Sequence, residues 1–479
     1  MTINCKYVML IGSRKPSTLY VIFLQYNMTK TLNSMSKRVI KKFLGGVHPK
    51  DIKASSRKRI EDATLPLKVI IPLHQHIGTP ACPIIEVGDN VKKGQKIAEA
   101  TGFVSANIHS SISGKVTSIG RNLFPALGRS SIAIVIETDG KDEWIEGIEP
   151  HDPYLLDAQQ IIEIIMQAGI VGMGGATFPT HVKLTIPEGK KIETILINGA
   201  ECESYVTADH VLMLEEPEKI IDGLKIIMRI TKAKNAFIGI EENKPDAINA
   251  LGKAVLNENN IEVAPLKVKY PQGWENMLIK AILHKEVPSS KLPLDFGTIV
   301  SNVSTANAIS NAIRLGHPLI ERVVSVNGSG IVEPKNLRVR IGTTFSDLIK
   351  QCGGLSGEIG KIIAGGPMMG SSMSDVNVPV AKGTNNILIL TKDEVKELQP
   401  RACIRCGRCI DVCPVRLMPR MIALNAQKGK IKESEAYFPL DCKECGCCAY
   451  VCPSKIPLLQ LIQFAKTDIT ARQRSAKAK

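Results

Sequence analysis

Two cysteine runs with identical spacing lie near the C-terminus and account for eight of the 13 cysteines. The first comprises Cys403, Cys406, Cys409 and Cys413, and the second comprises Cys442, Cys445, Cys448 and Cys452. Each run reads C-x2-C-x2-C-x3-C-P, the spacing that holds 4Fe-4S clusters in two-cluster bacterial ferredoxins, where the fourth cysteine ligates the other cluster. We therefore predict two clusters with crossed ligands: Cys403, Cys406, Cys409 and Cys452 for one, and Cys442, Cys445, Cys448 and Cys413 for the other.

Zinc is the alternative metal for cysteines in such a pattern. Structural zinc takes four ligands, usually from two pairs set farther apart, so four cysteines within eleven residues, duplicated and each followed by proline, favour iron–sulfur clusters. Cys447 is an additional thiol, and we take Cys448 as the ligand because it preserves the spacing. Clusters carry single electrons and do no substrate chemistry alone, so another part of the chain or a partner must supply the electrons.

A glycine-rich loop over residues 169–180 has the composition of a phosphate-binding turn. Gly172, Gly174 and Gly175 leave backbone N–H groups accessible, and the helix expected after the loop adds partial positive charge at its N-terminus. Lys183 lies one helical turn further on, where its ammonium could meet the same anion. The loop does not match G-x-x-x-x-G-K-[ST], which disfavours a P-loop ATPase, and a purely structural turn is the alternative.

Polar residues follow two of the expected strands. Glu201 and Glu203 come after the strand expected at residues 193–198, and Asn302 ends the one expected at 297–302. Ligands of a doubly wound sheet bind beyond the carboxyl ends of its strands, so these side chains belong to the same candidate site as the loop. A solvated loop is the alternative for the two acids.

The segments that must position these residues differ in pattern. Residues 63–140 alternate short apolar runs with glycine turns, which indicates a small all-β unit. Residues 150–316 alternate strand-like and helix-like segments, which indicates an α/β layer with a largely parallel sheet. Residues 320–395 are β-rich around one helix, and we interpret them as a spacer. The predicted fold class is multidomain α/β plus all-β.

The first β-rich unit resembles biotinyl and lipoyl carrier domains in residues 87–97 and 113–116. Those carriers bear a lysine at a hairpin tip, whereas residues 99–107 here contain no lysine. The resemblance implies a barrel-sandwich fold without a swinging-arm cofactor.

A second resemblance covers the candidate site. Residues 169–180, 198–203 and 301–303 resemble the flavin- and NADH-binding domain of the complex I flavoprotein. The order of carrier-like barrel, flavin domain, β-grasp-like domain and two-cluster ferredoxin domain resembles the RnfC family of the Rnf electron-transport complex, from about residue 35 to near residue 465. The match is specific because four unrelated signals occur in one order.

The resemblance implies a binding site for flavin mononucleotide (FMN) and NADH. The implied contacts are Gly172, Gly174, Gly175 and Lys183 for the phosphate, Asn198, Asn302 and Thr305 for the rest of the flavin, Glu201 and Glu203 for the nicotinamide side, and Tyr270 and Glu275 for the adjacent wall. No catalytic side chain is implied, because flavin and clusters carry the hydride and electron transfer. The complex I pattern has Asp in place of Ala200 and Pro-Gly in place of Ser204 and Tyr205, so this chain departs from it on the NADH side.

We predict six segments along the chain. They are a disordered or spurious leader (1–34), an N-terminal arm with a barrel-sandwich, lipoyl-like domain (35–145), a Rossmann-like FMN- and NADH-binding α/β domain (146–317), a β-grasp-like (SLBB) domain (318–395), a domain with two 4Fe-4S clusters (396–465) and a basic tail (466–479).

The formal net charge of +15 is concentrated at the chain ends. Residues 1–60 carry 13 Lys or Arg against one acid, and residues 467–479 carry four against one. Basic ends on a nearly neutral body suit an anionic membrane surface rather than a nucleic-acid groove, and aromatic residues, at 4%, are too few for stacking on single strands. No stretch reaches the roughly 18 consecutive apolar residues that a spanning helix needs.

The resemblance implies an NADH-dependent oxidoreductase that works as part of a complex. Electrons would pass from NADH through FMN and the clusters to membrane-embedded and iron–sulfur partner subunits, and indirectly to ferredoxin, coupled to Na⁺ or H⁺ movement. The implied location is the cytoplasmic side of the inner membrane, as a peripheral protein. The alternatives are a flavin and iron–sulfur cobalamin reductase and a non-catalytic docking and electron-wire subunit. Nucleic acid is not an expected partner.

Overall fold

The structure is a computed structural model that describes residues 40–121, 131–289, 291–396 and 398–477. By their contacts, residues 41–479 form one unit, and the description below concerns that unit. The predicted leader, residues 1–34, lies outside the described residues. Within the described ranges no helix is both long and apolar enough to span a bilayer.

The α/β part is built on a four-stranded sheet in which all neighbouring strands are parallel. In sheet order the strands are β11 (Ile261–Leu266), β10 (Asn235–Glu241), β9 (Thr194–Asn198) and β12 (Thr298–Asn302). The parallel sheet predicted from the alternating segments is thus confirmed. Its topology brings the carboxyl ends of all four strands to one edge.

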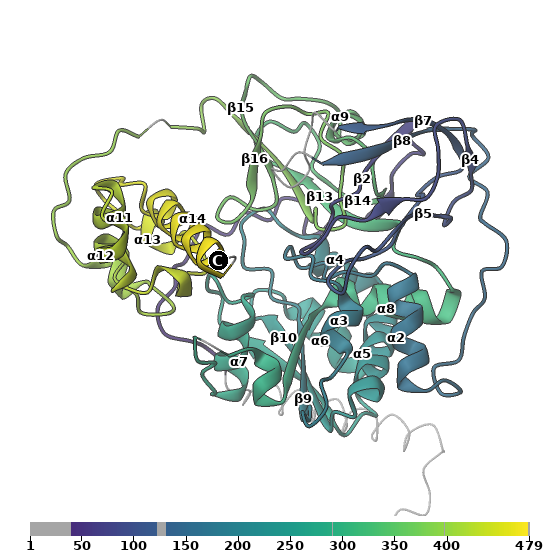
Figure 1. Cartoon of the computed structure of the whole chain (residues 1–479), viewed down its shortest axis with the longest axis horizontal. Helices are drawn as coiled ribbons and strands as arrows, with labels where there is room; N and C mark the ends of the chain where they lie inside the picture. Colours follow the sequence, from purple (N-terminus) through teal and green to yellow (C-terminus); the bar gives the residue numbers. More distant parts are fainter. Residues whose placement is uncertain (1–39, 122–130, 290, 397, 478–479) are drawn as a thin grey trace, which may run out of the picture. The chain divides into compact units, whose positions relative to one another are not determined.

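Helices cover both faces of this sheet (Figure 1). One face packs against α2 (Ala158–Gln167), α5 (Pro217–Thr231), α6 (Pro245–Ala254) and α8 (Val303–Leu315), and the other against α7 (Glu275–Leu283). Side chains alternate along β9, so Ile195 and Ile197 enter the first core and Leu196 enters the core with α7. Shorter elements of this part are α3 (Thr180–Leu184), α4 (Ala208–Glu215) and η2 (Pro293–Phe296).

The N-terminal β unit consists of two antiparallel sheets around a shared apolar core. The four-stranded sheet has the order β2 (Lys68–Pro72), β8 (Ile132–Thr138), β7 (Gly114–Arg121) and β4 (Asn90–Val91). The three-stranded sheet has the order β3 (Cys82–Pro83), β5 (Lys96–Glu99) and β6 (Ile108–His109). The lysine-free tip that joins β5 to β6 ends in residues 105–107, which are buried.

A six-stranded mixed sheet follows the α/β part. Its order is β1 (Ile60–Asp62), β14 (Lys335–Arg340), β13 (Glu321–Asn327), β17 (Asn386–Thr391), β15 (Ile359–Ala364) and β16 (Ser371–Met373), with α9 (Phe345–Gln351) in its core. Strand β1 precedes the N-terminal β unit in the chain, yet it pairs in parallel with β14. The segment before that unit therefore belongs structurally to the mixed sheet.

The C-terminal part is helical and holds both cysteine runs (Figure 1, yellow). Its elements are α10 (Arg408–Asp411), α11 (Pro419–Gln427), α12 (Ile431–Glu435), η3 (Pro439–Asp441), α13 (Cys447–Tyr450) and α14 (Leu458–Lys477). The residues expected as a basic tail continue α14 as far as Lys477. Ile462, Ala465 and Ile469 of α14 are buried against α11 and α12, so apolar packing extends this helix past the expected boundary.

The close approach of α5 and α8 predicts opposite effects for two glycine substitutions. A Cβ at Gly223 in α5 would lie 1.8 Å from the carbonyl oxygen of Ala306 in α8, whereas one at Gly252 in α6 would have nothing within 4 Å. We expect Gly223→Ala to lower the free energy of unfolding by about 1–3 kcal/mol through overpacking. Gly252→Ala should raise it by about 0.5–1 kcal/mol, because alanine favours a helix interior. Urea unfolding followed by circular dichroism measures both, and equal shifts would contradict this packing.

Candidate functional site

The glycine loop forms a narrow turn between α2 and α3. Gly172 N donates to Phe178 O at 2.8 Å and Thr180 N donates to Ile170 O at 3.0 Å, so the two arms are bonded to each other. Residues 174–176 at the tip are exposed. The tip therefore presents backbone groups to solvent from a fixed base.

The glycines at the tip leave room for a ligand. Gly175 has φ = +107°, a left-handed conformation that favours glycine, and a Cβ there would have nothing within 4 Å. A Cβ at Gly174 would lie 3.4 Å from Asn302 Cβ. The tip thus has Asn302 on one side and open space on the other, which fits a phosphate approached by N–H groups.

The sheet brings three predicted flavin contacts to this loop. Asn198 and Asn302 stand opposite each other in the register of β9 and β12. Asn302 caps α8 and donates to Asp209 Oδ2 at 2.7 Å. Thr305, in the first turn of α8, accepts from Met173 N of the loop at 2.9 Å. The two strand ends, the helix cap and the loop therefore form one continuous surface.

Lys183 and Glu275, both predicted site residues, pair with each other. Lys183 Nζ lies 2.8 Å from Glu275 Oε1, and each side chain is about one-third exposed. Lys183 extends from α3 and Glu275 from the start of α7. An anion at the loop would compete with Glu275 for the same ammonium group.

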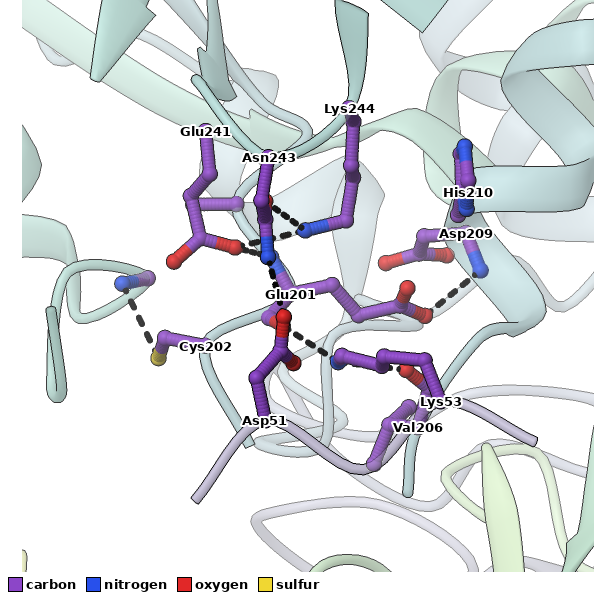
Figure 2. Close-up of polar contacts among 12 residues, drawn as sticks. Asp51, Lys53, Glu201, Cys202, Val206, Asp209, His210, Glu241, Asn243 and Lys244 are labelled. Carbon is purple, nitrogen blue, oxygen red and sulfur yellow. Dashed lines mark hydrogen bonds and ion pairs between the residues drawn. The ribbon is translucent and has the colours of Figure 1, made fainter. Parts of the chain in front are cut away.

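Glu201 lies in a polar network behind the strand ends (Figure 2). Glu201 Oε1 accepts from Asp209 N at 2.8 Å, while its backbone N donates to Glu241 Oε2 at 3.1 Å. Glu241 pairs with Lys244 at 2.7 Å, and both side chains are buried. Within the part of the chain that the structure describes, Glu201 Oε2 is buried without a hydrogen-bond partner, so one carboxylate oxygen is free for a ligand.

Lys53 holds the backbone of the loop that carries the two predicted acids (Figure 2). Its ammonium donates to the carbonyl oxygens of Glu201 (2.9 Å), Glu203 (2.7 Å) and Val206 (2.7 Å). A single cation therefore fixes three peptide groups, and the loop after β9 cannot move independently of the N-terminal arm.

Burial shifts the ionisation of this network. Burial and the charge of Glu201 raise the pKa of Asp209 to about 6, although Ser304 and Asn302 donate hydrogen bonds to it. Burial also lowers the pKa of Lys53, against the opposing charge of Glu201. Both shifts reduce the tendency of these groups to carry charge.

Two predicted residues face away from the glycine loop. The Glu203 carboxylate accepts from Met368 N (3.0 Å) and Met369 N (2.8 Å), and burial raises its pKa against these two bonds. The Tyr270 ring is buried, and its hydroxyl donates to Cys445 O at 2.7 Å. These residues contact the mixed-sheet part and the second cysteine run, respectively.

The polar network contains residues that the sequence reasoning missed. Glu241 ends β10, so the rule that singled out the acids after β9 applies to it as well. Lys53 lies 148 residues before Glu201 in a basic segment without a motif, and no local signal indicates its role. Asp209 and Lys244 are likewise defined only by the packed structure.

The two cysteine runs have the same local backbone. Arg405 and Glu444, at equivalent positions, both have φ = +57°. Arg405 N donates to Cys403 Sγ and Glu444 N to Cys442 Sγ, each at 3.4 Å. N–H groups directed at sulfur stabilise thiolates, which are the form that binds iron.

The fourth cysteine of each run lies beside the other run. Burial raises the pKa of Cys442 to about 11, and Cys445 and Cys413 add to the shift. Burial likewise raises the pKa of Cys409, with contributions from Cys406 and Cys452. In the described ranges no three His, Cys, Asp or Glu side chains converge to hold a single metal ion, and a four-iron cluster does not require this because each thiolate binds a different iron.

The two runs differ in exposure. Cys406 of the first run is exposed, whereas the second run packs against the α/β part through an apolar cluster that includes Val47, Tyr270 and Cys447. The Cys447 thiol donates a hydrogen bond to Cys445, which lowers the pKa of Cys445 to about 7. Cys447 therefore acts on a neighbouring sulfur.

Four domain families match successive parts of the chain. They are the RnfC barrel sandwich hybrid domain (residues 41–141), the Nuo51 FMN-binding domain (165–311), the SLBB domain (323–371) and a 4Fe-4S dicluster domain (402–456). The mixed α/β and all-β composition with barrel-sandwich, FMN-binding, SLBB and iron–sulfur domains is thus confirmed.

Similar proteins cover nearly the whole chain. The chain is 51% identical over 444 residues to the RnfC-type protein of the proton-translocating ferredoxin:NAD⁺ oxidoreductase complex of Clostridium ljungdahlii, covering 92% of this chain and 97% of that protein. It is 46% identical to the corresponding protein of the Na⁺-translocating complex of Acetobacterium woodii (90% and 98% covered). It is 44% identical to that of the ion-translocating oxidoreductase complex of Rhodobacter capsulatus (90% and 83% covered). The chain belongs to the RnfC family. The resemblance inferred from the motifs is confirmed.

Two neighbouring cysteines should differ in their effect on metal content. We expect about eight irons in the anaerobically purified protein, and about eight in Cys447→Ser, because serine can still donate a hydrogen bond to Cys445. Cys448→Ser should retain about four, since one cluster loses a ligand. Iron and acid-labile sulfide analysis measures this. The reverse order would identify Cys447 as the ligand, and stoichiometric zinc would refute both clusters.

Proposed function

We propose that the protein is the peripheral subunit through which an ion-translocating complex transfers electrons between NADH and its ferredoxin-side partners. FMN at the glycine loop and two 4Fe-4S clusters form the path. The observation that carries the proposal is the contact between these parts: Tyr270 follows β11 of the FMN-binding part, and its hydroxyl donates to Cys445 O at 2.7 Å. Transfer from a flavin to a cluster requires this kind of direct contact.

Bound FMN supplies the conversion between hydride transfer from NADH and the single electrons that clusters accept. The N–H groups of Gly172, Gly174 and Gly175 and the ammonium of Lys183 would hold its phosphate. Asn198, Asn302 and Thr305 would orient the remaining flavin. The support is geometric, because the three polar residues and the exposed loop tip adjoin at the carboxyl ends of β9 and β12.

The NADH side of the site is proposed on Glu201 and Glu203, with Tyr270 and Glu275 as the adjacent wall. The unpartnered Glu201 Oε2, within the residues that the structure describes, supports the first assignment. Glu203 is held by two backbone N–H groups and Tyr270 by Cys445, so these two would act through the position of the wall rather than as mobile ligands.

One cluster is proposed on Cys442, Cys445, Cys448 and Cys413, and the other on Cys403, Cys406, Cys409 and Cys452. The buried second run adjoins the flavin part, so its cluster would receive electrons first. The exposed first run would then face the partner subunits.

We further propose a peripheral position on the cytoplasmic side of the inner membrane, beside membrane-embedded and iron–sulfur subunits. The finer domain assignments belong to the same proposal: a Rossmann-like flavin domain on the parallel sheet and a β-grasp-like domain on the mixed sheet. Family membership favours this function over the cobalamin reductase alternative.

Substitutions in the loop should separate flavin binding from cluster binding. A Cβ at Gly174 makes only ordinary contact with Asn302, so Gly174→Val should fold but block the approach of the phosphate, with loss of FMN and retention of iron. Lys183→Ala should weaken FMN binding by about 1.5–3 kcal/mol, the usual contribution of a charge-assisted hydrogen bond. Flavin extraction and iron analysis measure both.

Gly120→Val is the matched control, because Gly120 lies in β7 and a Cβ there would have nothing within 4 Å. It should retain full FMN. Retention of full FMN by Gly174→Val would locate the flavin elsewhere. FMN bound without NADH-dependent dye reduction would favour the non-catalytic wire function.

A further inference from the structure

Two buried cations lie behind the glycine loop. Arg322 belongs to β13 and Lys382 to the segment between β16 and β17, so both come from the part that carries the mixed sheet. Their side chains are almost fully buried, with Arg322 3% and Lys382 1% exposed. The Nuo51-like part therefore does not hold its own loop unaided.

Lys382 ties the base of the loop to the N-terminal β unit. Its Nζ donates to Gly169 O at 2.6 Å and to Asn107 O at 2.8 Å. Asn107 is the last residue of the lysine-free tip, and a Cβ at Gly169 would lie 2.2 Å from Asn107 O. The tip, which carries the swinging arm in carrier domains, is here packed against the loop.

Arg322 determines which way a peptide group of the loop points. Its Nη2 donates to Met173 O at 3.3 Å, and its Nη1 donates to Lys382 O. The carbonyl of Met173 shares a planar trans peptide with the N–H of Gly174, so the two groups point in opposite directions. With the carbonyl bound from behind, the Gly174 N–H is directed toward the exposed face of the loop.

The two cations also lack direct counterions. In the described part of the chain, no carboxylate lies within ion-pair distance of Arg322 or Lys382, and backbone carbonyls alone satisfy them. Burying a cation without a paired anion is unfavourable. Their charge favours an anion in front of the loop.

We propose that Arg322 and Lys382 are positioning residues for the flavin phosphate. They bind the carbonyls behind the loop, orient its N–H groups toward the phosphate and add positive potential. The inference rests on the proposed FMN site. It predicts an effect specific to the phosphate, which a general role in joining the domains would not produce.

Riboflavin, which lacks the phosphate, provides the test. Full-length protein freed of flavin but retaining its clusters would be titrated with FMN and with riboflavin, followed by flavin fluorescence. Lys382→Met and Arg322→Met should weaken FMN binding about 10- to 100-fold while riboflavin binding changes less than about threefold. Lys335→Met is the control, because Lys335 lies on the same sheet, is largely buried and pairs with Glu61 at 2.9 Å. It should leave the FMN to riboflavin ratio unchanged.

The conservative variants Lys382→Gln and Arg322→Lys keep a donor in each position and should give intermediate FMN preference. They also test the inference if the methionine variants do not fold. Equal weakening of both flavins, or an unchanged ratio in all four variants, would overturn the inference. A wild-type protein without any preference for FMN over riboflavin would instead refute the phosphate site itself.

Discussion

The structure depends on holding loops that cannot hold themselves. A phosphate loop needs accessible N–H groups and therefore glycine, which supplies no side chain to fix the turn. The bonds that fix this loop come from outside it or from its own arms: Thr305 binds Met173 N, Arg322 binds Met173 O and Lys382 binds Gly169 O. Conformational freedom at the binding surface is thus offset by packing behind it.

The loop after β9 is held by the same kind of contact. Lys53 binds three carbonyl groups there, just as Lys382 binds the base of the glycine loop and the neighbouring tip. In each case the cation comes from a different part of the chain. The domains around the sheet therefore do more than cover it, because they determine the conformation of the two loops at its carboxyl edge.

The second cysteine run extends this arrangement toward electron transfer. It packs on Tyr270 and Val47, while the first run remains exposed. The asymmetry gives the proposed path a direction in space, from a buried contact with the flavin part to a surface that a partner can reach. Glu203 adds a further tie, since its carboxylate holds Met368 and Met369 of the mixed-sheet part close to the same loop.

Local patterns predicted the features that are encoded locally. The cysteine spacing, the glycine loop and the alternation of segments predicted the repeated thiol loops, the exposed tip and the parallel sheet, because each is set by residues close in sequence or by strand topology. Lys53, Arg322 and Lys382 could not be predicted, since their partners lie far away in the chain and follow no motif. For the same reason the pairing of β1 with the mixed sheet was missed. The continuation of α14 depends on packing against α11 and α12, which a basic composition does not reveal.

The central claim is that electrons enter the clusters of this chain only through flavin at the glycine loop. Anaerobic titration with NADH, followed by flavin absorbance and by electron paramagnetic resonance of the clusters, tests it directly. The account predicts that NADH reduces both centres in the native protein, and that after removal of flavin only a chemical reductant reduces the clusters. Reduction of the clusters by NADH without flavin would contradict it, as would flavin that NADH reduces while the clusters remain oxidised.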